Sequence, residues 1–131
     1  MVETPLVATD ITDGQSAVRA LDADRVECRS AFWLYFGEAI EYRLVFVLPE
    51  VDRKGSAHGY RLVQRAFRRH GVELPLSRVA VVGLKDRVPH AIHRVVGRAP
   101  ADANGTPVRP HLGRRCVDGI TIEDAYVYRS A

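Results

Sequence analysis

Residues 32–48 read FWLYFGEAIEYRLVFVL, and this stretch decides the fold. Gly37 separates two runs rich in aromatic and β-branched side chains, which favour β-strands. In a strand, successive side chains point to opposite faces, so Phe32, Leu34 and Phe36 would share one face, with Trp33 and Tyr35 on the other. A glycine between two such runs is typical of a turn between paired strands, so the sequence predicts a β-hairpin within residues 25–48. Its second strand, residues 41–48, is apolar on both faces at its far end, which predicts a place inside the sheet.

A long helix is expected after the hairpin. Pro49 ends the second strand because it lacks a backbone N–H, and a charged loop is expected at residues 50–55. Apolar side chains then recur at helical spacing over residues 57–70. Ser56 is suited to cap the first turn, and Gly71 lies where helices commonly end in glycine. The apolar side of this helix should pack on the sheet.

The remaining predicted elements complete a mixed sheet. In chain order they are a first helix capped by Asp13 and ending near Asp24, a strand at 79–82, a helix at 88–96, a long loop at 98–113, and strands near 117–122 and 125–128. The order is approximately α-β-β-α-β-α-β-β, in which the hairpin requires antiparallel pairing and the later β-α-β unit allows one parallel strand. We therefore predict a single α+β domain over residues 1–131, with a mixed, mostly antiparallel sheet.

Length and composition exclude several classes of protein. A chain of 131 residues that is 47% hydrophobic can bury the core of one ordinary domain. No apolar run approaches the ~20 residues of a membrane-spanning helix, and the first residues lack the layout of a secretory signal. Cys28 and Cys116 lie far apart, without metal-ligand spacing, and are expected as free thiols. We therefore expect a cytoplasmic protein with no membrane partner.

Charge is distributed unevenly along the chain. Residues 1–52 contain ten acidic and four basic side chains, whereas residues 53–98 contain eleven basic and two acidic ones. Three interpretations stay open: the two parts neutralise each other within one fold, they meet head-to-tail in a homo-oligomer, or the basic part faces an anionic partner.

The basic charges gather on the predicted helix 57–70. Arg61, Arg65 and Arg68 are spaced so that they share the face opposite the apolar one. Arg69 adds charge at the C-terminal end, and Lys54 could extend the patch. Because guanidinium groups donate two hydrogen bonds at once to phosphate or carboxylate, this face predicts binding of nucleic acid, another polyanion or an acidic protein. The alternative is a solvated face, or one paired with the N-terminal acids.

Carboxylates offer a competing enzymatic hypothesis. Glu41 precedes Arg43 by two positions on one face of the predicted strand, an arrangement that metal-dependent nucleases use with a further acid to hold Mg²⁺. That acid could come from Asp24, Glu27 or Asp52. The alternative is an ion pair on a wet face of the sheet.

Histidines offer a candidate metal site. His90 and His93 are three positions apart on the predicted helix 88–96, so both could bind one metal ion. His111 and Cys116 could complete a tetrahedral set. The alternative is that these are surface histidines.

The last predicted strand places Asp124, Tyr126 and Tyr128 on one face. Two tyrosines with an acid could bind a ligand. The alternative is that the tyrosines seal a sheet edge with their hydroxyls in water.

Two resemblances bear on these hypotheses. The stretches Phe32–Tyr35, Glu41–Val45 and Gly119–Arg129 resemble a small bacterial family of proteins of similar length, which implies one compact domain and no particular activity. Residues Gly83–Arg87 are similar to a catalytic loop of the D-type tRNA pseudouridine synthases, which implies that Asp86 attacks a nucleoside. The alternative for Asp86 is the N-cap of the helix that follows.

The sequence favours a small binding or interaction module that contacts nucleic acid or another polyanion through the face of Arg61, Arg65 and Arg68. The alternatives are a metal-dependent nuclease built on Glu41 and a self-assembling structural or regulatory subunit.

Overall fold

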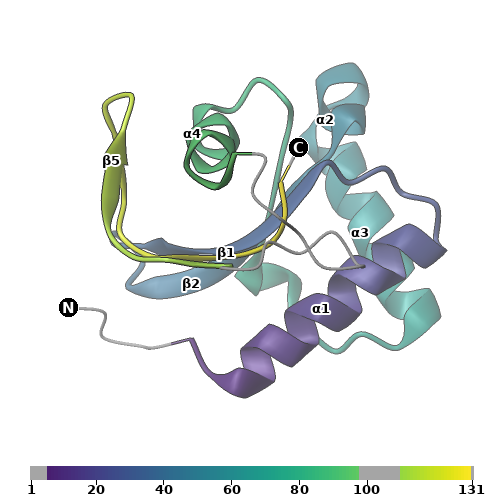
Figure 1. Cartoon of the computed structure of the whole chain (residues 1–131). Helices are drawn as coiled ribbons and strands as arrows, with labels where there is room; N and C mark the ends of the chain where they lie inside the picture. The colour runs from purple at the N-terminus through teal and green to yellow at the C-terminus, as the bar shows by residue number, and fades with distance from the viewer. Residues whose placement is uncertain (1–5, 98–109, 131) are drawn as a thin grey trace.

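The predicted hairpin forms the middle of a five-stranded sheet in the computed structural model, which describes residues 6–97 and 110–130 (Figure 1). The strand order is β3-β2-β1-β7-β4. These strands are β1 (Ser30–Phe36), β2 (Glu41–Val47), β3 (Val79–Val82), β4 (His111–Leu112) and β7 (Ala125–Arg129). β2 pairs antiparallel with β1 and parallel with β3, so it has a neighbour on both sides, as its two apolar faces predict.

Helices cover both faces of this sheet. They are α1 (Ala8–Ala23), α2 (Pro49–Lys54), α3 (Ser56–His70) and α4 (Arg87–Val96), with a short 3-10 turn at Leu76–Arg78. Figure 1 shows α1 and α3 beneath the sheet and α4 above it. The predicted α+β class with a mixed sheet is confirmed. No helix of the described residues is long and apolar enough to cross a membrane.

Each face of the hairpin enters a different hydrophobic core. Trp33, Leu44 and Phe46 belong to the cluster that α1 and α3 cover, whereas Phe32 and Val45 belong to the cluster under α4. The alternation in residues 32–48 therefore decides which helices each side chain meets, because a shift of one residue would exchange the two cores.

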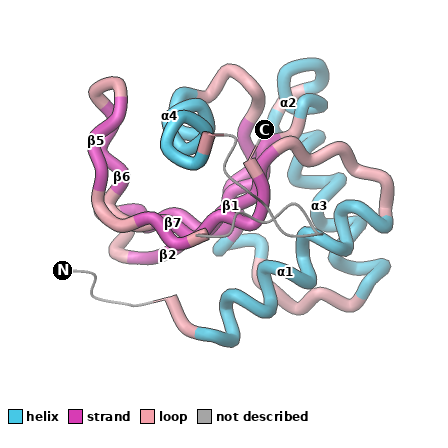
Figure 2. The backbone as a smooth tube through the Cα atoms, viewed as in Figure 1, coloured by secondary structure: helices cyan, strands magenta, loops and turns pink. Residues whose placement is uncertain are grey.

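The end of the chain differs from the prediction. The prediction of one strand over residues 117–122 is wrong. Two short strands, β5 (Arg115–Val117) and β6 (Ile120–Ile122), form a separate two-stranded ribbon beside α4 (Figure 2). Asp118 and Gly119 turn the chain between them with φ of 52° and 78°. An Asp-Gly pair suits this tight turn because both residues tolerate positive φ.

The predicted loop at 98–113 is wrong in its last part. Residues 98–109 lie outside the described residues, but His111–Leu112 form β4, which pairs antiparallel with β7. The predicted last strand is confirmed as β7.

Two helix starts also differ from the prediction. α1 begins five residues before Asp13, which is therefore not its cap; the Asp10 carboxylate accepts a hydrogen bond from the Val7 N–H at 3.3 Å instead. In α3 the N-cap position is Gly55, one residue before Ser56. The left-handed Gly71 at the C-terminal end of α3 is confirmed, with φ of 68°.

A helix also replaces the charged loop predicted at 50–55. α2 begins at Pro49, whose missing N–H costs nothing in a first turn and whose fixed φ favours a helix. β2 ends at Val47, and α2 begins at the proline after the single residue Leu48.

Candidate functional site

α3 separates apolar and basic side chains around its axis. Its exposed side carries Arg61, Arg65, Arg68 and Arg69, which we call the arginine face. The buried side consists of Gly59, Val63, Ala66 and Phe67, and the Phe67 ring meets Phe46 of the sheet edge-to-face at 6.2 Å. The guanidinium groups therefore lie outside and the apolar side chains inside, as the spacing predicts.

One carboxylate from the acidic part of the chain lies against the arginine face. Asp24, just after α1, is within 3.3 Å of Arg65 Nε and 3.2 Å of Arg69 Nη1, and its side chain is only 5% exposed. Burial alone would raise the pKa of Asp24, but the hydrogen bonds and charges of Arg69 and Arg65 outweigh it and lower that pKa below its ordinary value. Part of the charge asymmetry is thus neutralised within the chain.

The rest of the arginine face has no such partner. Within residues 6–97 and 110–130, no carboxylate forms an ion pair with Arg61 or Arg68. Lys54 is exposed at the end of α2, immediately before α3 begins. Four arginines faced by one carboxylate leave this surface strongly positive.

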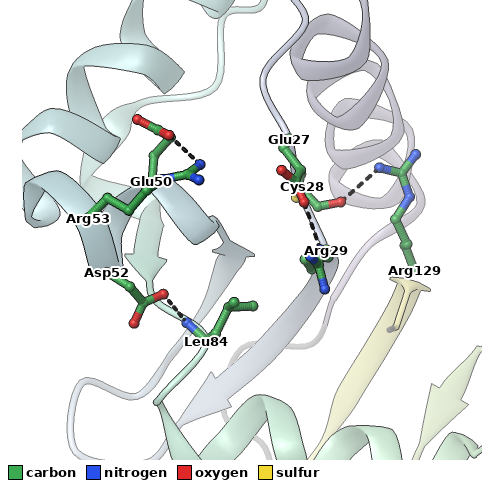
Figure 3. A network of polar contacts seen from close by, with 8 residues as sticks. All are labelled: Glu27, Cys28, Arg29, Glu50, Asp52, Arg53, Leu84 and Arg129. Atoms are coloured by element: carbon green, nitrogen blue, oxygen red, sulfur yellow. Dashed lines mark hydrogen bonds and ion pairs between the residues drawn. The ribbon is translucent and has the colours of Figure 1, made fainter.

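The carboxylates of the nuclease hypothesis are not brought together. Glu41 begins β2 and lies 2.9 Å from Arg43 Nε on the same strand, whereas Asp52 follows the other end of β2. Seven strand residues separate these ends by about 20 Å. Figure 3 shows the Asp52 carboxylate accepting the Leu84 N–H, at 2.7 Å, and Glu27 pairing with Arg29, at 2.7 Å.

The ion-pair interpretation therefore describes Glu41 in this structure. The Asp24 carboxylate is also in an ion pair, with Arg65 of α3. Among the described residues, no three His, Cys, Asp or Glu side chains are grouped so that they could hold a metal ion.

The two histidines of α4 point to different partners. His90 Nε2 lies 2.7 Å from the Leu84 carbonyl oxygen, whereas His93 Nδ1 lies 3.1 Å from Ser130 Oγ. Cys116 is exposed on β5. Cys28, in contrast, is buried, and burial raises the pKa of its thiol to about 12, so it stays protonated.

Asp86 caps α4. Its Oδ1 accepts a hydrogen bond from the Val88 N–H at 2.9 Å, and its backbone is extended, as an N-cap residue requires. The capping interpretation of Asp86 is confirmed.

A cluster that no motif in the sequence indicates lies on the sheet itself. Asp124 Oδ1 is 2.6 Å from His111 Nε2, and its Oδ2 accepts a hydrogen bond from the Tyr42 hydroxyl. We call Tyr42, Asp124 and His111 the Asp124 cluster. Burial, followed by the hydrogen bond and charge of Asp124, raises the pKa of Tyr42. Tyr42 therefore remains a hydrogen-bond donor to the carboxylate.

The tyrosines of β7 do not seal an edge. β4 lies beyond β7, and Tyr128 is buried, with its hydroxyl donating to the Ile11 carbonyl at 2.6 Å. The prediction that Asp124, Tyr126 and Tyr128 share a face is confirmed by their contacts on the side of α1. The sheet-edge interpretation is wrong because β4 supplies one more strand.

Comparisons with protein-family models, with curated proteins and with solved structures gave no match. The two resemblances in the sequence therefore stay predictions, and the function must be inferred from the geometry of the chain itself.

Proposed function

We propose that this protein binds nucleic acid through the arginine face of α3. The observation that carries the proposal is the exposure of four arginines on one 15-residue helix, opposed by the single carboxylate of Asp24. Arg61 and Arg68 are about 10 Å apart along the helix axis, which allows contact with more than one phosphate. Their planar guanidinium groups match the geometry of phosphate oxygens.

The composition of this surface favours nucleic acid over an acidic protein. Stable protein interfaces have an apolar centre, and exposed aromatic or aliphatic anchors supply most of their affinity. Among the described residues, the large hydrophobic side chains that are exposed are Val7 and Ile40, and neither lies on α3. A charged surface without an apolar centre suits the phosphate backbone, whose recognition is electrostatic and independent of sequence.

Fluorescence anisotropy with labelled DNA and RNA, single- and double-stranded, tests the proposal at low salt. The Arg61→Glu/Arg65→Glu/Arg68→Glu variant should stay folded and lose binding. A milder Arg61→Gln/Arg68→Gln variant removes two guanidinium groups without adding repulsion. It should reduce the slope of log K against log salt by about 0.7–0.9 for each phosphate that the variant no longer neutralises.

A matched control removes two exposed arginines elsewhere. Arg94 and Arg114 are 68% and 75% exposed and lie outside α3, so the Arg94→Gln/Arg114→Gln variant loses the same charge. It should bind as the wild type does, apart from a small general effect of net charge. The proposal is wrong if the wild type binds no nucleic acid at low salt, or if this control loses as much affinity as Arg61→Gln/Arg68→Gln.

A further inference from the structure

The Asp124 cluster has the parts of an oriented imidazole base. It lies towards the β4 edge of the sheet, whereas α3 contacts the opposite edge strand, β3. β4 places His111 directly across from Tyr126 of β7, and Asp124 precedes β7 by one residue. The Tyr35 N–H donates to the Asp124 carbonyl at 3.0 Å, which fixes the backbone where the carboxylate begins.

The hydrogen bond to Asp124 selects one form of the His111 ring. An ionised carboxylate only accepts hydrogen bonds, so the Nε2 atom, 2.6 Å from Asp124 Oδ1, carries the proton. In the neutral ring the lone pair is then on Nδ1. Because Tyr42 occupies the other carboxylate oxygen, Asp124 is held from both sides and keeps the ring in one orientation.

The His111 side chain is exposed to solvent, whereas the Asp124 carboxylate that it contacts is mostly buried. The two side chains are 64% and 16% exposed. Each of the five histidines lies in the described part of the chain, which allows a comparison. His58 and His70 lie 3.4 and 3.7 Å from carboxylate oxygens, and His90 faces a neutral carbonyl. His111 alone among the five combines exposure with a short contact to a carboxylate.

We infer that His111 is a nucleophilic imidazole that accepts acyl groups from uncharged acyl donors. Nδ1 attacks the carbonyl carbon of an ester, and the bond to the leaving alkoxide or phenolate oxygen breaks with its electron pair. The ring is then positively charged, and the adjacent Asp124 carboxylate stabilises that charge. Water attacks the acyl-imidazole, and the acyl–nitrogen bond breaks with its electron pair returning to Nδ1. The carboxylic acid leaves, and the proton released in this step passes to the departed alkoxide or phenolate, which leaves the ring neutral as at the start.

The surroundings select the class of substrate. The Asp124 charge repels a phosphate or carboxylate at the ring, so an anionic electrophile is disfavoured. The partly exposed Tyr35 and Tyr126 rings lie on the same side of the sheet and suit an aromatic leaving group. This inference is independent of the proposed nucleic-acid binding, because the same negative charge keeps phosphates away from His111.

The probe is p-nitrophenyl acetate, with release of p-nitrophenolate and the mass of the acetylated protein as readouts. The His111→Gln variant should lose most of the reaction, and the acetyl group should map to His111 in the wild type. We expect roughly a tenfold drop, below the about 10²–10⁴-fold of enclosed acid–base sites because His111 is exposed. His90→Gln is the matched control, since its ring is exposed but faces a carbonyl, and it should react as the wild type does.

In this inference Asp124 is a positioning residue, and its role is tested by a separate measurement on the His111 ring. The Asp124→Asn variant should slow the reaction and change the tautomer of His111, as seen in the ¹⁵N chemical shifts of the ring. Circular dichroism checks that the variant is folded, and Tyr42→Phe, which removes one partner of Asp124, should give a smaller loss of rate. The inference is overturned if His111→Gln reacts like the wild type, or if His90→Gln loses as much.

Discussion

The hydroxyl of Tyr60, on α3, accepts a hydrogen bond from the backbone N–H of Val81 at 3.2 Å, on the outer edge of β3. The same hydroxyl donates to the Val79 carbonyl at 3.3 Å. β3 is an edge strand of the sheet, and unpaired backbone groups on such an edge are a template for another strand. Tyr60 therefore occupies the hydrogen-bonding positions that a strand from a second molecule would use.

Tyr60→Phe should both weaken the fold and expose this edge. Loss of the hydroxyl leaves two backbone groups without their partner, which should lower the free energy of unfolding by about 1 kcal/mol. Light scattering over a concentration series should show more self-association than in the wild type. Tyr35→Phe is the control, because within the described residues the Tyr35 side chain makes a ring contact with Tyr42 and no hydrogen bond through its hydroxyl. A Tyr60→Phe protein that is monomeric and as stable as the wild type would contradict this role.

Gly14→Ala should destabilise the protein, although alanine is the better helix former. An added Cβ would lie 2.2 Å from the Tyr128 hydroxyl and 2.7 Å from Trp33 Nε1. Neither group can move away cheaply, because Trp33 donates to Tyr128 at 2.9 Å inside the core. In an open helix the same change would gain about 1 kcal/mol, so we expect a loss of about 1–3 kcal/mol from overpacking to outweigh it.

Urea unfolding measures this effect against a second glycine. Gly37 has no atom within 4 Å of the position of an added Cβ and no positive φ, so Gly37→Ala should change the free energy of unfolding little. If Gly14→Ala is as stable as Gly37→Ala, the close packing of α1 on Trp33 and Tyr128 is wrong.

Ile40→Asn should stabilise the protein. Ile40, in the turn between β1 and β2, has φ of 52° and is 53% exposed. The left-handed conformation costs a β-branched residue about 1–2 kcal/mol, and asparagine adopts it more readily. We expect a gain of about 1 kcal/mol, measured by thermal and urea unfolding. Ala39→Asn controls for asparagine itself, because Ala39 has no positive φ; equal effects of the two variants would show that φ is not the cause.

The sequence predicted the elements whose pattern is local. The hairpin and α3 carry periods of 2 and 3.6 between clear ends, and β3 is a short apolar run that ends at a glycine. α2 could not be predicted in this way, because six residues are too few to show a period. The Asp118–Gly119 turn was readable as a hairpin signal, but the apolar residues on both sides of it favoured a single strand.

The two candidate sites also differ in whether a local sequence pattern can reveal them. The arginine face lies on one helix, so its spacing reveals it. The Asp124 cluster takes one residue from β2, one from β4 and one from the end of a loop before β7, and only the strand order brings them together. No local pattern marks His111, because β4 has two residues and its pairing with β7 depends on the whole sheet.

Asp24→Asn should lower stability and raise affinity for nucleic acid at the same time. The pKa of Asp24 is lowered in the folded state, so its ion pairs stabilise the fold above the ordinary pKa of 3.8 and are lost as the pH falls through the folded-state pKa. The difference in unfolding free energy between wild type and variant should therefore be full at pH 6 and shrink below pH 3.8. At neutral pH, Arg65 and Arg69 no longer face a charge and are free to contact phosphate, so binding should tighten and its salt dependence should steepen.

Asp22→Asn separates the two effects. Asp22 also lies near the end of α1, but it pairs with Arg129 of β7, at 2.7 Å, instead of the arginine face. This variant should lose stability without any gain in affinity, because it frees no guanidinium group on α3. If both variants bind nucleic acid equally well, Asp24 does not restrain the arginine face, and the surface that binds nucleic acid must be sought elsewhere on the chain.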